Sequence, residues 1–301
     1  MLDQSKRETL RTFWHGSPLS PYHLFCLQSF VSRGHRIELF SYEPAFVVPS
    51  WIVLRDAAEI LPSERVFRYQ SGPGKGSPAL HANLFRLCML ERLGGWWIDA
   101  DVLLLRPQLP EDAYFFAPDG NHFSNAILKF PASHPLLIEG VERCQAIGHA
   151  AAWAQTGPVL FTELVKKFNL SKYAHPKNTC YPILYHEIEA LFDPARCSEV
   201  KRRCEGAIFI HLYNEMWRRA GIPVGLGPPP GSFLDRLSDE FGFSFLSPDR
   251  LQFAQVLQAI EQERGPPPPR PTSNPVRALI RLGLGRKAMF RPLIRRKKHI
   301  D

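Results

Sequence analysis

The apolar and polar positions of the first forty residues predict alternating strands and helices. Residues 11–14 have the pattern of a short strand. Ser20 and the proline after it begin a predicted helix, whose apolar side chains recur every three or four positions until Gly34. Residues 35–42 then alternate in the manner of a second strand. A strand, a helix and a strand in this order predict a βαβ unit, and therefore an α/β fold.

Similar patterns continue along the chain, and no internal repeat is visible. Ser133 stands where the N-cap of one helix is expected, and Gly157 with the proline after it begins another. We expect helices over residues 52–61, 134–147, 157–168 and 248–262, and strands over residues 114–117, 126–130, 180–185 and 207–212.

The segment from residue 77 to residue 107 has the clearest pattern. Ser77 is placed to cap a helix that has Pro78 in its first position, and leucines recur at helical spacing until Gly94 ends the helix after about four turns. Gly94 and Gly95 permit a tight reversal. Two tryptophans and an isoleucine then predict a buried strand over residues 96–98.

Two aspartates, Asp99 and Asp101, follow this strand directly. Residues two apart in an extended chain point to the same side, so both carboxylates are expected to face one point in space. An apolar run over residues 102–105 places the pair between two buried segments. Two carboxylates in such a place repel each other and favour a bound cation. A solvated loop or a helix cap is the alternative interpretation of an isolated acidic pair.

The predicted helix before the aspartates carries Asn83 and Arg86 three residues apart, on one face. Arg86 stands among apolar positions, so it either pairs with a buried carboxylate or faces an anionic group of a ligand. A divalent cation held by carboxylates, together with an arginine, is an arrangement that binds a diphosphate, with Mg²⁺ or Mn²⁺ bridging phosphate oxygens. The segment therefore suggests a nucleotide diphosphate as a leaving group.

Composition narrows the class of protein. The 301 residues, 45% of them hydrophobic, suit one large or two small domains with a substantial core. No apolar run reaches the roughly eighteen residues that a membrane span needs, and the first ten residues lack the apolar region of a signal peptide, so we expect a cytoplasmic protein. The six cysteines lack paired spacing and are expected to be reduced and mostly buried.

The net charge of +8 belongs to one end of the chain. Residues 270–301 contain ten Lys or Arg and one Asp, a net charge of +9, which leaves −1 for residues 1–269. Because the body is nearly neutral, no nucleic acid is expected as a partner. The basic tail is expected either to bind an anionic membrane surface, which would make the protein peripheral at the inner membrane, or to be a solvated end.

The central segment resembles the sugar-binding DXD signature of glycosyltransferase family 32. Together its features are far less frequent by chance than a DxD pair alone. One departure matters, because the family usually has Ser-Asp where this chain has Ala82-Asn83. The features that carry the resemblance are a polar Asn83 three residues before Arg86, seven further residues, Gly94 with Gly95, an aromatic residue, and the Asp99-x-Asp101 pair.

Weaker similarity to this family covers about residues 10–220. Trp14 and the loop after it resemble the family's first strand and W-x-G loop, in which an aromatic ring can stack on a nucleotide base. A core tryptophan at a sheet edge is the alternative. Asn125 lies in a segment similar to the one whose asparagine lines the sugar pocket, and Gly157 lies in a T-G-P turn. His211 and Asn214, followed by a tryptophan, are similar to the family's late His-x-x-Asn segment.

The resemblance implies a GT-A fold, which is a Rossmann-like α/β nucleotide-sugar-binding domain with a mixed central sheet. It also implies retaining transfer of a hexose from a UDP- or GDP-sugar to a glycan or lipid-linked acceptor, as in cell-surface polysaccharide synthesis. The catalytic domain would cover residues 1–225, a helical extension packed on it residues 226–264, and a proline-rich linker with the basic tail residues 265–301.

The resemblance also assigns roles to residues. Asp101, with Asp99 and His211, would hold Mn²⁺ or Mg²⁺, Arg86 and Asp99 would support catalysis, and no nucleophile is identified. A non-catalytic nucleotide-sugar-binding relative is the alternative function, because the family's carboxylate is missing at Asn83. The implied donor-binding residues are Trp14, Asn83, Arg86, Asp99, Asn125 and Gly157.

Overall fold

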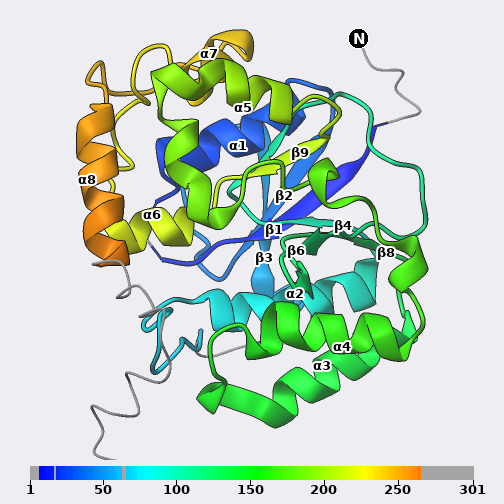
Figure 1. The fold of residues 1–301 in the computed structure, drawn as a ribbon. Coiled ribbons are helices and arrows are strands. Elements are labelled where there is room, and N and C mark those ends of the chain that lie inside the picture. Colours follow the sequence, from blue (N-terminus) through cyan, green and yellow to red (C-terminus); the bar gives the residue numbers. More distant parts are fainter. Residues whose placement is uncertain (1–6, 17, 63–65, 266–301) are drawn as a thin grey trace, which may run out of the picture. The chain divides into compact units, whose positions relative to one another are not determined.

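A five-stranded mixed sheet forms the centre of the fold. The computed structural model describes residues 7–16, 18–62 and 66–265. The sheet has the strand order β3–β2–β1–β4–β8 (Figure 1). The β1–β2, β1–β4 and β2–β3 pairs are parallel and the β4–β8 pair is antiparallel, which confirms the predicted α/β fold with a mixed sheet. The strands are β1 (Thr9–Phe13), β2 (Arg36–Ser41), β3 (Ile52–Asp56), β4 (Gly95–Ile98) and β8 (Ile127–Phe130).

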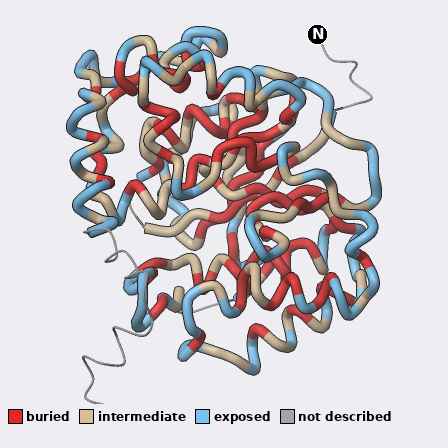
Figure 2. The backbone as a smooth tube through the Cα atoms, viewed as in Figure 1, coloured by how far each residue is buried: buried red, intermediate tan, exposed pale blue. Residues whose placement is uncertain are grey.

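Helices cover both faces of this sheet (Figure 1). Successive strand side chains point to opposite faces, so each strand contributes to two apolar cores. Leu39 and Trp96 belong to the core that includes α1, whereas Phe40 and Trp97 belong to the core that includes α2. Figure 2 shows the buried residues concentrated along the strands and on the inner sides of the helices. The helices are α1 (Pro21–Val31) and α5 (Cys197–Arg203) on the first face, and α2 (Ala79–Leu93), α3 (Pro135–Ile147) and α4 (Leu160–Lys167) on the second.

The remaining elements are short. Side chains of α7 belong to the core that includes α1. The helix expected over residues 248–262 is observed as α8, and the strand expected over residues 207–212 as β9. Two pairs of short strands are β5 (Val102–Leu104) with β9 (Phe209–His211) and β6 (Pro118–Asp119) with β7 (His122–Phe123). The remaining helices are α6 (Asn214–Ala220), α7 (Phe233–Glu240) and α8 (Phe253–Arg264). The short helical turns are Ala57–Glu59, Gly148–Ala150, Gln155–Val159, Ser171–Tyr173, Lys177–Thr179, Tyr185–Leu191 and Pro194–Arg196.

The helix–turn–strand segment that precedes the aspartates agrees with the prediction, except at its start. α2 begins at Ala79, and the Ser77 hydroxyl accepts a hydrogen bond from the Ala79 N–H at 3.2 Å. Gly94 ends the helix with φ of +61°, and a Cβ added there would lie 2.6 Å from the Ala132 nitrogen. Only glycine therefore fits at this reversal, which sets the direction of β4.

The helix expected over residues 52–61 is wrong. Residues 52–56 form the edge strand β3, which pairs in parallel register with β2, and only the 3₁₀ turn Ala57–Glu59 follows. The Asp56 carboxylate accepts a hydrogen bond from the Ala58 N–H at 2.9 Å and begins that turn. Pairing with β2 decides the structure, because Ile52 and Val53 suit a strand and the sheet supplies partners for their backbone groups.

Three other expectations are corrected. Residues 180–185 form no strand, and Pro182, which has no N–H to donate, lies in their middle. Residues 114–117 contribute only an isolated bridge between Phe115 and Lys129. Ser133 has φ of +55° and does not cap α3; His134 does, because its ring nitrogen accepts a hydrogen bond from the Leu136 N–H.

The cysteines agree with the prediction of reduced thiols. All six are free, and four of them are buried. Among the described helices, none combines the length and the apolar character that crossing a membrane would require.

One buried histidine makes the stability of the fold depend on pH. His81 in α2 is fully buried, and its Nε2 lies 3.0 Å from the Tyr42 hydroxyl, which donates its proton to the Leu61 carbonyl. Nε2 must therefore donate to Tyr42, and Nδ1 has no partner among the described residues. Burial, with smaller contributions from two other histidines, lowers the pKa of His81 to about 4.

We predict that the free energy of unfolding falls by about 2 kcal/mol between pH 7.5 and pH 5 because of His81 alone. The sign follows from proton uptake. Between an unfolded pKa of about 6.5 and the folded value, the unfolded chain binds more protons than the folded one. Urea denaturation at both pH values measures the change. It should shrink in His81→Leu and persist in a control, His122→Gln, at an exposed site. An equal loss in His81→Leu would contradict the assignment.

Candidate functional site

A tight turn between β4 and β5 carries the two aspartates. Asp99 follows β4 directly, and the Val102 N–H donates to the Asp99 carbonyl at 3.2 Å, so the chain turns here instead of remaining extended as predicted. Nevertheless the two carboxylates converge. One ligand atom from each of Asp99, Asp101 and His211 lies within 4.8 Å of the other two.

The pairing of β5 with β9 brings in the histidine. Val102 is opposite His211 in this antiparallel pair, and the Leu212 N–H donates to the Asp101 carbonyl at 2.9 Å. The His211 Nε2 consequently lies 3.2 Å from an Asp101 carboxylate oxygen. The sequence predicted that this histidine lies with the two aspartates, and the structure places it beside them; its role as a metal ligand stays a prediction.

Asp101 is the more acidic member of the acidic pair. Burial would raise its pKa, but the His211 charge and hydrogen bond, together with the Asn214 N–H that donates to its other oxygen at 2.8 Å, hold the pKa well below its usual range. Burial would likewise lower the pKa of His211, and the Asp101 carboxylate raises it above its usual value. The two groups therefore stabilise each other as an ion pair.

Asp99 has different partners. Its carboxylate accepts a hydrogen bond from the Trp97 indole N–H at 2.8 Å and forms an ion pair with Arg86 at 3.1 Å. Burial raises the pKa of Asp99, Arg86 opposes this increase, and the neighbouring Asp101 adds to it, so that the pKa lies above its usual value. Of the two carboxylates, Asp99 is therefore the first to take up a proton.

Arg86 pairs with a buried carboxylate, which was one of the two alternatives that the sequence left open. It is 4% exposed, pairs with Asp99, lies over the Trp97 ring at 4.9 Å, and donates to the Asn125 carbonyl. It also lines the cavity described below. The guanidinium thus supports the acidic pair, and its contact with an anionic group of a ligand stays a prediction.

Three predicted donor-binding residues meet in a polar cluster next to Arg86. Asn125 donates a side-chain hydrogen bond to the Asn83 amide oxygen at 3.1 Å, and the Asn83 nitrogen lies 3.2 Å from the Tyr69 hydroxyl. A Cβ added to Gly157 would lie 3.0 Å from that nitrogen, so glycine lets the turn approach the amide. Asn83 is buried, and the residues lining the cavity nearby are Ala82 and Arg86. The cluster therefore stands behind the cavity wall.

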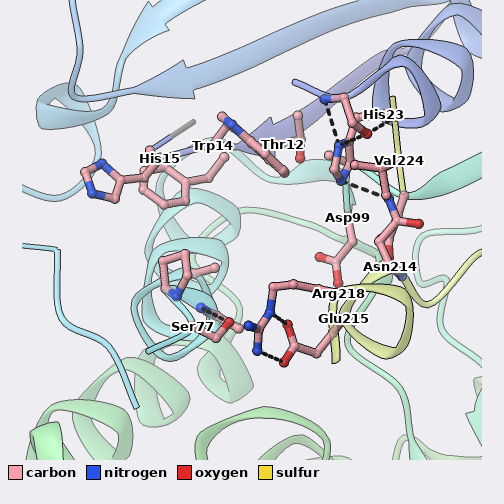
Figure 3. A pocket seen from close by; sticks show the side chains of 18 of the residues that line it. Thr12, Trp14, His15, His23, Ser77, Asp99, Asn214, Glu215, Arg218 and Val224 are labelled. Carbon is pink, nitrogen blue, oxygen red and sulfur yellow. Dashed lines mark hydrogen bonds and ion pairs between the residues drawn. The ribbon is translucent and has the colours of Figure 1, made fainter. Parts of the chain in front are cut away.

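A cavity of about 790 Å³ opens beside the aspartates. This volume suits a small-molecule ligand. Figure 3 shows Trp14 and His15 on one side of it, with Asp99 and Asn214 on another. Trp14 therefore lines the cavity, and its stacking on a nucleotide base stays a prediction. The lining residues come from the end of β1 and its loop (Thr12, Trp14, His15), from α2 (Ala82, Arg86), from the acidic turn (Asp99, Asp101) and from α6 and the loop after it (Asn214, Arg218, Val224).

His23 is a residue of this cavity that sequence reasoning missed. It lies in the first turn of α1, its ring centroid is 4.4 Å from that of Trp14, and burial lowers its pKa to about 4. Nothing in the sequence distinguishes it from an ordinary capping-box residue. Trp217, the tryptophan that follows the His-x-x-Asn segment, is fully buried, and its ring packs against Tyr22.

The chain is similar in sequence to known glycosyltransferases. Residues 129–229 match the model of the alpha 1,4-glycosyltransferase conserved region. A human alpha-1,4-N-acetylglucosaminyltransferase is 27% identical over 146 residues, which are 44% of this chain, and the chain spans 41% of that relative's length.

Two solved structures are also similar at low sequence identity. The PaToxG glycosyltransferase is 11% identical with a TM-score of 0.42, covering 56% of this chain and 72% of that one. The glycosyltransferase GlyE of Streptococcus pneumoniae is 9% identical with a TM-score of 0.41, covering 84% of this chain and 62% of that one. The family match and the human relative support the similarity to glycosyltransferase family 32 that the DxD signature had indicated.

Proposed function

We propose that the chain is a divalent-cation-dependent, retaining hexosyltransferase. In this proposal it moves a hexose from a UDP- or GDP-sugar to a glycan or lipid-linked acceptor in cell-surface polysaccharide synthesis. The observation that carries the proposal is the convergence of Asp99, Asp101 and His211 beside a cavity that Arg86 also lines. The retaining outcome and the acceptor class rest on the family resemblance.

The chemistry of these side chains fits a divalent cation. When His211 is neutral, as a metal ligand must be, the two carboxylates carry more negative charge than Arg86 balances, and a cation would relieve their repulsion. Carboxylate oxygens suit Mg²⁺ and Mn²⁺, and an imidazole nitrogen departs from the all-oxygen shell that Mg²⁺ prefers. Asp101 and His211, with Asp99, would therefore hold Mn²⁺ in preference to Mg²⁺.

Such a cation, when bound, supplies positive charge that neutralises a departing diphosphate. The chain itself contributes the rest. Arg86 presents a fixed guanidinium at the cavity wall, where it can stabilise negative charge as it develops, because its contacts with Asp99 and Trp97 hold it in place. Trp14 offers an aromatic surface to the nucleotide base. Asn125 is anchored by Asn83, so that the cluster behind the wall holds the sugar end of the pocket rigid.

A non-catalytic nucleotide-sugar-binding relative is the competing function, because Asn83 replaces the family's carboxylate and is engaged in the buried cluster. Donor hydrolysis with Mn²⁺ separates the two functions. Release of free sugar from a UDP- or GDP-sugar supports the transferase, whereas saturable donor binding without turnover supports the competitor.

The metal assignment predicts the behaviour of Asp101→Asn. In wild type, Mn²⁺ with UDP or GDP should raise the melting temperature, since a ligand at 100 times its Kd stabilises by about 2.7 kcal/mol. Asp101→Asn should lose most of this rise because it removes a negatively charged ligand of the cation. The matched control is Glu163→Gln, at an exposed carboxylate on α4, which should respond like wild type. An undiminished rise in Asp101→Asn would refute the assignment.

We also propose that the basic tail binds anionic lipid at the inner membrane surface and brings the enzyme to its acceptor. Residues 270–301 lie outside the described residues, and their net charge of +9 carries the proposal. Each basic residue near an anionic surface contributes about 1 kcal/mol.

Deletion of residues 266–301 tests this idea. The full chain should co-sediment with vesicles that contain phosphatidylglycerol and not with pure phosphatidylcholine vesicles, and added salt should weaken binding because it screens the charges. The shortened chain should remain in the supernatant with both kinds of vesicle. Equal co-sedimentation of the two chains would refute a role for the tail.

A further inference from the structure

A row of aromatic rings leads from the acidic site to the protein surface. The His211 ring, whose Nε2 contacts Asp101, packs against the ring of Tyr213 with the centroids 4.2 Å apart. The next ring is that of Tyr185, 6.4 Å from Tyr213. Tyr213 is 9% exposed and Tyr185 is 51% exposed. The exposed ring of Tyr185 is therefore only two ring contacts away from His211.

This row of rings lies outside the cavity described above. Asp99 and Asp101 line the cavity, whereas His211, Tyr213 and Tyr185 are not among the described residues that line it. The acidic pair therefore borders on the cavity and, through His211, on the row of rings. A second ligand that binds on the row would approach the acidic pair without occupying the cavity.

The backbone of Tyr213 has a conformation that is unfavourable for a bulky residue. Its φ of +54° and ψ of 50° lie in the left-handed region. Such a conformation persists only where the surrounding contacts impose it, and it is concentrated at functional sites. Here the turn lets the residues on both sides, His211 and Asn214, reach Asp101. The Tyr213 hydroxyl donates to Asp119 at 3.0 Å, so the same turn connects the acidic site to a further carboxylate.

Asp119 belongs to the hairpin of β6 and β7, where it pairs with His122. It is half-buried, and residues 120–122 at the tip of the hairpin are exposed. A carboxylate has lone pairs for several hydrogen bonds, so Asp119 can accept from Tyr213 and also from a ligand. Tyr213 thus contacts an exposed aromatic ring through its own ring and an anchored carboxylate through its hydroxyl.

An aromatic ring and a carboxylate together suit a hexose. One face of a hexose ring carries C–H groups, which pack on the electron-rich face of an aromatic ring, and its edge carries hydroxyl groups, which donate to a carboxylate. A protein partner would require a wider apolar surface. Tyr185 is instead followed by His186 and by Glu187, which forms an ion pair with Arg203 at 2.7 Å.

We propose that Tyr185 and Asp119 bind a hexose of the acceptor, with the Tyr185 ring against one face of the sugar and Asp119 accepting a hydrogen bond from a hydroxyl group. This inference rests on the proposed function, because a transferase must hold a second sugar next to the donor. The bound hexose presents another hydroxyl group to the acidic site. Tyr213 is a positioning residue, since it holds Asp119 and packs beside Tyr185 while remaining buried itself.

The binding of simple hexosides tests the site. Saturation-transfer difference NMR of the full chain, with Mg²⁺ and UDP or GDP, is measured with methyl glycosides of glucose, galactose, mannose and N-acetylglucosamine. At least one should receive saturation, mainly at the protons of one face of its ring. Tyr185→Ala should reduce the affinity for that hexoside about five-fold or more, because the stacking surface is lost.

Two variants are the controls for Tyr185→Ala. Tyr185→Phe keeps the aromatic ring and should keep most of the hexoside affinity. Tyr173→Ala removes a different tyrosine, which is 46% exposed, and should bind the hexoside like wild type. Equal affinities in wild type and Tyr185→Ala would overturn the inference, and so would the absence of any hexoside signal in a wild-type chain that binds UDP or GDP.

Substitutions of Asp119 and Tyr213 test the other half of the site. Asp119→Ala should weaken hexoside binding about five-fold or more, and Asp119→Asn should restore part of it because an amide oxygen still accepts. Tyr213→Phe should weaken binding several-fold, with little further effect in an Asp119→Ala background, since the two residues act as one unit. Its affinity for Mn²⁺ alone, measured by isothermal titration, should equal that of wild type. Additive losses in the double variant would contradict the positioning role.

The same NMR titration without nucleotide separates this inference from the proposed function. A hexoside signal that depends on Tyr185, in a chain that binds neither UDP nor GDP, would support the sugar site and overturn the proposed transferase. Nucleotide binding without a hexoside signal that depends on Tyr185 would overturn the sugar site and leave the proposed transferase in place.

Discussion

The repulsion between the Asp99 and Asp101 carboxylates is the constraint on which the organisation of this site depends. Each carboxylate has its own set of partners. Asp99 forms an ion pair with Arg86 of α2 and accepts a hydrogen bond from the indole N–H of Trp97 in β4. Asp101 pairs with His211 of β9 and accepts a hydrogen bond from the backbone N–H of Asn214 at the start of α6. These elements belong to cores on opposite faces of the sheet, so the site forms only when both faces have packed.

The two sets of partners leave the carboxylates unequal. Asp101 is held ionised by an imidazolium and a backbone donor, and Asp99 takes up a proton more easily. Negative charge is therefore concentrated next to His211, at the edge of the cavity. A divalent cation there would replace the His211 charge as the partner of Asp101 and would face an anionic ligand at the same time. Binding of the cation and of a diphosphate are expected to reinforce each other for this reason.

Where the local pattern was strong, the sequence predicted the fold. The Ser20–Pro21 start of α1, the leucine spacing of α2 and the glycines before β4 each correspond to a contact in the structure. Where tertiary contacts determine the secondary structure, the sequence did not predict it. Residues 52–56 have a pattern compatible with a helix or a strand, and they form an edge strand because β2 offers backbone partners. Such pairing between segments cannot be read from either segment alone.

The sequence predicted some residues of the site and missed others, because their positions also depend on tertiary contacts. Asp99, Asp101, Arg86 and His211 were expected together and do converge. Asn83 and Gly157 lie in a buried layer that supports Asn125, and their contact with a donor stays a prediction. The sequence indicated the polar character of these residues but not their depth. His23 was missed because its place beside the cavity depends on tertiary contacts such as the one with Asn214, 191 residues away.

The location of a bound cation tests most directly whether Asp99, Asp101 and His211 form a metal site. Crystals of the full chain grown with Mn²⁺ and UDP or GDP, with diffraction measured at the manganese absorption edge, show the ion by its anomalous signal. One strong peak is expected within ligand distance of an Asp101 oxygen and the His211 Nε2, on the cavity side of Asp99. No peak there at saturating Mn²⁺, or a peak bound by other side chains, would contradict this assignment.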